Sequence, residues 1–154
     1  MTPSIHESLS ESTVAKIQDL IRVNIDSHLG FETVSECVEH LDTKLLLLDM
    51  AFERKRFADE LQTLVAFNDE DPVDDGSVVA HMHRWWIELK GMVTSGSRAS
   101  MLEEALRGED KIKARYEEVT PEVAGSPAYD LVLNHLVSIR TTHARLKTLA
   151  NTAS

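Results

Sequence analysis

The sequence predicts an all-α protein, a bundle of four long helices with a short extra helix in the connection between the second and third of them. Apolar residues recur at intervals of three and four along most of the chain, which places them on one face of a helix. All four prolines lie at or beyond the ends of these periodic segments. At 154 residues, the chain fits a single domain with a substantial core.

The first two long helices are predicted over residues 12–40 and 43–66. The apolar stripe of the first consists of Val14, Ile17, Ile21, Ile25, Leu29 and Val38. The stripe of the second consists of Leu46, Met50, Phe57, Leu61 and Leu64. Asp42 is expected to cap the second helix, because its carboxylate can accept hydrogen bonds from the free amides of a first turn. The turn between the helices is short, so an antiparallel pair is expected.

A long connection follows the second helix. Residues 67–77, FNDEDPVDDGS, contain a proline, a glycine and an acidic run, and are expected to form a solvated loop. A short helix is expected from Gly76 or Ser77 to about Val93, and TSGSRAS at 94–100 is a second break. Since this connection can carry the chain back along the bundle, the second and third long helices are expected to run parallel.

The last two long helices are predicted over residues 99–119 and from Ser126 to about Ala150. The stripe of the third long helix consists of Leu102, Leu106, Ile112, Tyr116 and Val119. Gly108 weakens its middle, and Pro121 is expected to end it. Ser126 is expected to be the N-cap of the last helix, with Pro127 at its first position. Four helices with one long crossover form the ferritin-like topology.

Composition limits the partners of this chain. We expect a flexible terminus over residues 1–11 and one domain over residues 12–150. With 26 acidic and 16 basic residues, the net charge of −10 disfavours binding to nucleic acid or an anionic membrane. The longest apolar run, LLLL at 45–48, is far shorter than the about 20 residues of a membrane span. A single cysteine, Cys37, suits a reducing compartment, so a cytoplasmic protein is expected.

Four segments resemble, in the same order, a bacterial ferritin-like family of unknown function. They are DSHLGFETVSE (26–36), ERKRFADELQ (53–62), GSVVAHMHRWWIELKG (76–91) and LRGEDKIKARYEEV (106–119). The most specific parts are Gly-Glu-Asp followed by Tyr-Glu, and His-Arg-x-Trp before Leu-Lys. The resemblance implies a ferritin-like four-helix bundle and no particular activity. Leu106 stands where family patterns often carry a glutamate, which weakens any site inferred at that position.

A metal centre is the main catalytic alternative. Di-iron bundles use a glutamate from each of two helices and a Glu-x-x-His pair from each of the others. None of the seven histidines has a glutamate three positions before it, so a standard centre is not expected. One inward polar residue per long helix remains as a candidate ligand: Glu32, Glu53, Glu109 and His143.

Two interpretations of these four residues remain open. In one, they hold iron or manganese in a degenerate di-iron or mononuclear site, as in an oxidoreductase or iron-handling protein. In the other, which we favour, the three glutamates pair in a charge network or lie at the edge of the bundle, because buried charges need partners. Their candidate partners are Arg54, Arg56, Arg140 and His143. On this second interpretation the chain has no cofactor.

The segment HMHRWWIELKG, residues 81–91, is predicted to serve packing rather than metal binding. Its two histidines lie about 200° apart on a helix and cannot share an ion. Trp85 and Trp86 are expected to anchor the crossover helix to the bundle or to a second subunit. No nucleophile elbow or phosphate-binding loop is present, so no catalytic residue is assigned. We expect a non-enzymatic structural or interaction protein that forms a homodimer.

Overall fold

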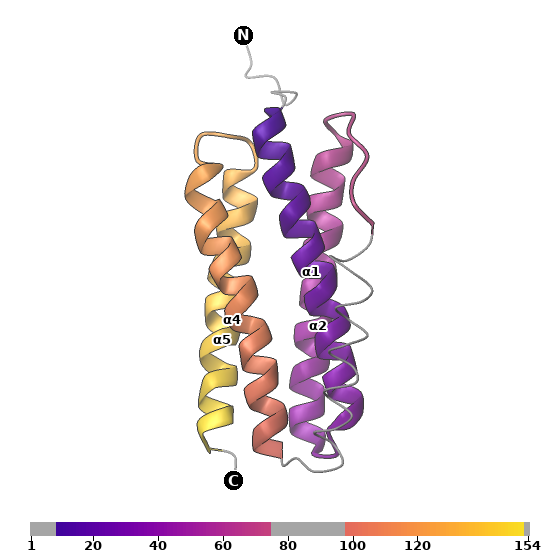
Figure 1. The fold of residues 1–154 in the computed structure, drawn as a ribbon, viewed down its shortest axis with the longest axis vertical. Coiled ribbons are helices and arrows are strands. Elements are labelled where there is room, and N and C mark those ends of the chain that lie inside the picture. The colour runs from indigo at the N-terminus through magenta and orange to yellow at the C-terminus, as the bar shows by residue number, and fades with distance from the viewer. Residues whose placement is uncertain (1–8, 75–97, 153–154) are drawn as a thin grey trace.

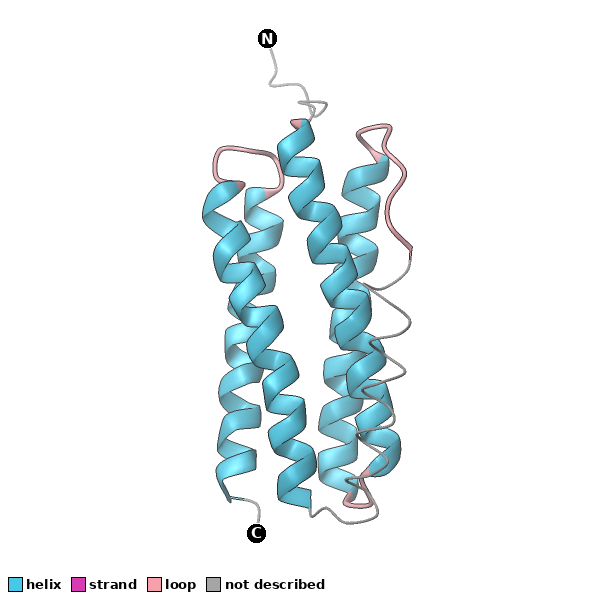
Figure 2. Ribbon diagram, in the orientation of Figure 1, coloured by secondary structure: helices cyan, strands magenta, loops and turns pink. Residues whose placement is uncertain are grey.

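The computed structural model describes residues 9–74 and 98–152, which form four helices and contain no strand (Figures 1 and 2). The helices are α1 (Glu11–Cys37), α2 (Leu41–Ala66), α4 (Arg98–Glu122) and α5 (Tyr129–Thr152). The predicted all-α class is confirmed for this part of the chain. No helix within it is long and apolar enough to cross a membrane. The predicted short helix, with Trp85 and Trp86, lies outside the described residues.

The helices form two hairpins that pack side by side (Figure 1). α1 packs against α2 in the first hairpin and α4 against α5 in the second, and α1 also packs against α4. α2 ends at the end of the bundle where α1 begins, whereas α4 begins at the opposite end (Figure 1). α2 and α4 therefore point in the same direction, as the long connection between them predicts.

The beginning of this connection lies against the first hairpin. The Gln18 side chain donates a hydrogen bond to the Asp71 carbonyl at 2.8 Å and accepts one from the Val73 amide at 2.9 Å. Gln62 of α2 donates to the Val73 carbonyl at 2.8 Å. At the other end of the connection, Arg98 Nε donates to Thr43 Oγ1 at 3.0 Å. Both ends of the crossover are thus fixed by side chains of α1 and α2.

The ends of the first two helices depend on different groups. Ser10 caps α1, because its hydroxyl accepts a hydrogen bond from the Thr13 amide at 3.1 Å. α2 begins at Leu41 after the extended residue His40, which makes no side-chain cap. The prediction that Asp42 is the cap was wrong, because Asp42 lies within the first helical turn. There its negative charge still interacts favourably with the helix dipole.

The boundary between α4 and α5 differs from the prediction by a few residues. α4 continues through Pro121 to Glu122, so the expectation that Pro121 ends the helix was wrong. A proline is tolerated there because the last turn loses only one backbone hydrogen bond to it. Ser126 accepts a hydrogen bond from the Ala128 amide at 3.2 Å, as expected of a capping residue. Regular helix begins only at Tyr129, so the prediction that Pro127 is the first helical residue was wrong.

The core consists of two apolar clusters, one toward each end of the bundle. The first cluster centres on Ile17, Ile21, Phe57, Leu61, Tyr116 and Ile139. The second centres on Phe31, Val34, Leu47, Met50, Leu102 and Leu146. Buried polar residues from all four helices lie within the first cluster and at its boundary with the second, and they form the candidate site.

Two predicted stripes deviate from the observed core by one or two residues. Leu29 of α1 is 38% exposed and Ile25 is only partly buried, whereas Asn24 and Phe31 are buried. Steps of four residues overshoot a helical turn by about 40°, so a stripe extended in such steps turns away from the core. In α2, Leu47 and Val65 are buried in place of the predicted Leu46 and Leu64, which lie partly buried beside them.

Candidate functional site

A layer of buried polar side chains crosses the middle of the bundle. It contains Asn24 of α1, Arg54 of α2, Glu109 and Tyr116 of α4, and His135 of α5. Each of these residues lies three or four positions from an apolar core residue of its own helix, so the helical repeat itself directs it inward. Burial of polar groups is unfavourable unless hydrogen bonds compensate for the lost water. The contacts within the layer therefore determine what it can do.

Arg54 is the centre of the first group of contacts. Its Nη2 donates to Glu109 Oε1 at 2.5 Å and to Thr142 Oγ1 at 3.0 Å, and its Nη1 donates to Glu53 Oε1 at 3.0 Å. The side chains of Arg54 and Glu109 are both 0% exposed. One guanidinium thereby links carboxylates of α2 and α4 with a hydroxyl of α5.

Aromatic rings enclose this guanidinium. The ring centroids of Phe31 and Phe57 each lie 5.8 Å from Arg54 Cζ. At this distance, the negative face of an aromatic ring attracts a cation. The rings also exclude water, which strengthens the attraction between Arg54 and Glu109.

The Arg54–Glu109 pair is strong but incompletely hydrogen-bonded. Burial raises the pKa of Glu109, whereas the charge of Arg54 and the hydrogen bond from Thr142 act in the opposite direction. Among the described residues, Glu109 Oε2 and Arg54 Nε have no hydrogen-bond partner. Removal of either partner would leave a buried group of one charge without compensation.

Tyr116 and His135 form a second group of contacts in the layer. Asn24 Nδ2 donates to the Tyr116 hydroxyl at 2.7 Å, and this hydroxyl lies 2.9 Å from His135 Nδ1. On the other side of the ring, His135 Nε2 lies 3.1 Å from Glu60 Oε1. The Tyr116 hydroxyl accepts from Asn24 and donates to Nδ1, so the neutral ring carries its proton on Nε2 and donates it to Glu60.

The surroundings of His135 keep its ring neutral. Burial lowers the pKa of His135 to about 4, although the hydrogen bond and charge of Glu60 act in the opposite direction. The Phe57 ring stacks on the imidazole, with a centroid distance of 3.9 Å and an interplanar angle of 15°. Burial also raises the pKa of Tyr116. At neutral pH, this group of contacts is therefore a chain of neutral hydrogen bonds that ends at one surface carboxylate.

The structure brings two of the four candidate metal ligands together and places the other two elsewhere. Glu53 and Glu109 both accept hydrogen bonds from Arg54. Glu32 is half-exposed and lies 3.5 Å from His28 Nε2. His143 Nε2 lies 2.5 Å from Asp110 Oδ1 near the surface.

The donor set at the centre does not fit a metal ion. Arg54 lies between the two carboxylates, and its guanidinium keeps its positive charge at all physiological pH values. A cation bound between Glu53 and Glu109 would be repelled by this charge. Within residues 9–74 and 98–152, no group of three or more His, Cys, Asp or Glu side chains is arranged to hold a metal ion.

Sequence reasoning identified some residues of this layer and missed others. Tyr116 was predicted to lie on the apolar stripe of its helix, and its burial confirms this. Asn24 and His135 were missed. His135 follows Val132 by three positions and precedes Ile139 by four, so the helical repeat contained the signal. Of the suggested arginines, Arg54 joins the layer, while Arg140 lies 3.6 Å from Glu117 at the surface.

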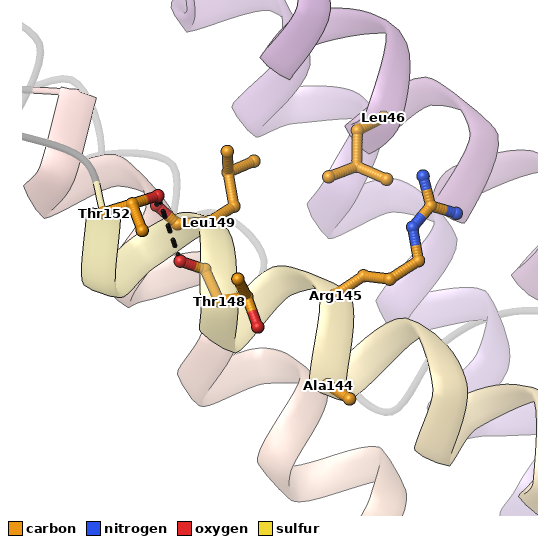
Figure 3. Close-up of a pocket in the computed structure, with 6 residues that line it drawn as sticks. All are labelled: Leu46, Ala144, Arg145, Thr148, Leu149 and Thr152. Atoms are coloured by element: carbon orange, nitrogen blue, oxygen red, sulfur yellow. Dashed lines mark hydrogen bonds between the residues drawn. The ribbon is translucent and has the colours of Figure 1, made fainter.

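A shallow groove lies apart from the layer, between α2 and the end of α5 (Figure 3). Its volume is about 460 Å³, and it is lined by Leu46, Ala144, Arg145, Thr148, Leu149 and Thr152. The side-chain hydroxyl of Thr152 donates to the Thr148 carbonyl at 3.1 Å, one turn earlier in α5 (Figure 3). Arg145 is the one charged side chain among these residues, so the groove holds no acid–base pair for catalysis.

These features define a helical bundle with a buried, hydrogen-bonded polar layer. Residues 12–122 match the model of a family described as a domain of unknown function, DUF2383, and the chain belongs to this family. The predicted resemblance to a family of unknown function is thereby confirmed. No curated protein matches the chain. The family match ends at the last residue of α4, so α5, which contributes His135 and Thr142, lies beyond it.

Proposed function

We propose that this chain is a non-enzymatic structural or interaction protein with a ferritin-like four-helix bundle. The observation that carries this proposal is the buried Arg54 guanidinium, which donates hydrogen bonds to Glu53, Glu109 and Thr142. It supplies positive charge between the helices where a metal-dependent bundle would supply a cation. The parallel direction of α2 and α4 supports the ferritin-like topology.

The chemistry of the polar layer supports a structural role. An arginine does not act as a proton donor or acceptor near neutral pH, and the guanidinium occupies Oε1 of both Glu53 and Glu109. Phe57 stacks on the His135 ring, and the two ring nitrogens face Tyr116 and Glu60. Both nitrogens are therefore occupied by protein groups. We also propose a cytoplasmic location, which the single cysteine suits. We propose partners other than nucleic acid or an anionic membrane, because the charge of −10 repels polyanions.

Metal content tests this proposal directly. Tag-free protein is purified without chelator, incubated anaerobically with ferrous iron or manganese, passed over a desalting column and analysed for metal. We expect far less than one ion per chain and no shift of the thermal midpoint with either ion. Glu109→Gln and Glu53→Gln serve as site variants. Glu117→Gln is the matched control, since Glu117 lies on α4 and pairs at the surface with Lys113 and Arg140.

Retention of about one or two ions per chain by the wild type, lost in both site variants but not in Glu117→Gln, would overturn the proposal. It would support the alternative, a metal-binding oxidoreductase or iron-handling protein with a degenerate site. Retention of metal that all three variants share would place the ions outside the layer, and the structural role of Arg54 would stand.

A further inference from the structure

The outer face of α2 carries an apolar stripe. Leu41 is 65% exposed, Leu45 is 51% exposed and Phe52 is 67% exposed. Leu48, which is partly buried, lies between them in the sequence. We call Leu41, Leu45, Leu48 and Phe52 the outer stripe. Exposed apolar side chains that align on one helix are typical of an interaction surface.

The spacing of the outer stripe fits a second helix. Its members follow one another at intervals of four, three and four residues, which is the repeat of the apolar seam between two packed helices. The core face of α2, with Leu47, Met50 and Arg54, lies on the opposite side of the helix. The bundle thus uses one face of α2 for its own core, and the other face has the pattern of a coiled-coil seam.

Two charged residues beside the outer stripe are complementary to the same residues of a second, parallel α2. Lys44 and Asp49 flank the stripe on opposite sides and are separated by five positions. When two identical helices run parallel about a two-fold axis, this separation places Lys44 of one copy beside Asp49 of the other. Two such pairs form by symmetry. In an antiparallel arrangement, Asp49 would instead approach Asp42 of the other copy, and the like charges would repel.

We propose that a second copy of this chain covers the outer stripe, in a two-fold dimer whose α2 helices run parallel. The inference rests on the proposed interaction role and names the partner for it. The stripe spans three helical turns, so the interface falls below the usual size of a stable complex. The dimer is therefore expected to form in a concentration-dependent manner.

Sedimentation equilibrium of the full chain, over a wide concentration range, tests the proposal. We expect the wild-type mass to rise from 17.3 kDa toward twice that value. Leu45→Glu/Phe52→Glu is expected to remain monomeric with an unchanged circular dichroism spectrum. Val137→Glu is the matched control and is expected to dimerise like the wild type, because Val137 is an exposed apolar residue of α5.

A charge exchange tests the arrangement of the two helices. Lys44→Asp is expected to raise the dissociation constant about ten-fold, because it opposes Asp49 of the partner. The double variant Lys44→Asp/Asp49→Lys is expected to restore dimerisation. An unchanged dissociation constant in Lys44→Asp would overturn the parallel arrangement.

Two further results would overturn the dimer. They are a wild type that stays monomeric at every concentration, and a dimer that Leu45→Glu/Phe52→Glu leaves intact. If the wild type is monomeric and the thermal midpoint falls in this variant, the stripe makes a contact within one chain. A dimer that retains metal, with the metal lost in Glu53→Gln and Glu109→Gln, would contradict the proposed function alone, whereas a metal-free monomer would contradict the dimer alone.

Discussion

At the scale of single residues, the centre of the bundle depends on a charge pair rather than on apolar packing. Arg54 and Glu109 are both fully buried, and each would be unfavourable in the core without the other. Glu53 contributes a second carboxylate from a partly exposed position. The pair therefore specifies how α2, α4 and α5 meet, because other rotations of these helices would separate the charges.

Loss of Arg54 alone is expected to destabilise the fold much more than loss of both Arg54 and Glu109. Arg54→Met should lower the free energy of unfolding by about 3–5 kcal/mol, because Glu109 is left buried without a counter-charge. Arg54→Met/Glu109→Leu should recover most of this loss, since two apolar side chains replace the pair. Urea denaturation monitored by circular dichroism measures both variants.

Arg107→Met is the control for this pair. Arg107 also pairs with a glutamate, Glu104, but its side chain is 67% exposed, so the change is expected to be under about 1 kcal/mol. A loss in Arg54→Met no larger than in Arg107→Met would contradict a stabilising role of the buried pair.

At the scale of elements, α4 contains a residue that destabilises the helical conformation. Gly108 lies at an exposed position in the interior of α4, and a β-carbon placed there meets no atom within 4 Å. Glycine loses more backbone entropy on folding than alanine does, so it weakens a helix interior. The fold therefore does not require a glycine at this position.

Gly108→Ala is expected to raise the free energy of unfolding by about 0.5–1 kcal/mol, because alanine favours the helical backbone. Gly125→Ala is the contrasting variant. Gly125 also has free space, but its φ of 83° disfavours a side chain, so a loss of about 1–2 kcal/mol is expected. Thermal denaturation compares the two. Destabilisation by Gly108→Ala would show that the position has a contact or a function beyond helix formation.

At the scale of the whole molecule, His135 connects the four helices through its hydrogen bonds. It lies on α5, stacks on Phe57 of α2, and reaches α1 through Tyr116 of α4 and Asn24. Protonation of His135 would place a charge in this buried position, near Arg54 and Arg56. The stability of the fold should therefore depend on the ionisation of this one ring.

The direction of this pH dependence follows from the lowered pKa of His135. An unfolded histidine has a pKa of about 6.5, and the folded ring has a pKa of about 4, so the unfolded chain binds the proton more tightly between these values. The contribution of His135 is fully present above pH 6.5 and is lost as the pH falls toward 4. At its steepest, the loss is about 1.4 kcal/mol per pH unit.

Chemical denaturation of the wild type and His135→Gln at a series of pH values between 4 and 7 measures this effect. The difference in unfolding free energy between the two proteins isolates His135 from carboxylates that titrate in both. It should decrease as the pH falls below 6.5. A difference that stays constant over the whole range would contradict a neutral, buried His135.

The amino-acid sequence alone determined the helices, their order and the direction of the crossover. Val14, Ile17 and Ile21 repeat at helical spacing whatever they pack against, because this pattern is a property of one segment. The family resemblance was likewise carried by local segments such as residues 53–62. The free energy of a hydrogen-bonded cap, or of a proline in a last turn, is small. The helix ends predicted at Asp42 and Pro121 therefore differ from the observed ends by a few residues.

Tertiary packing alone decided which polar residues enter the core. The helical repeat predicts that Glu53 points into the core, yet the structure buries its neighbour Arg54. A rotation of about 100° separates adjacent helical residues, so a small rotation of the helix exchanges them. The same margin separates Asn24 from Ile25, and Thr142, which donates to Glu109, from His143. The sequence fixes the period of each helix, but its rotation is determined by the neighbouring helices, and these lie far away along the chain.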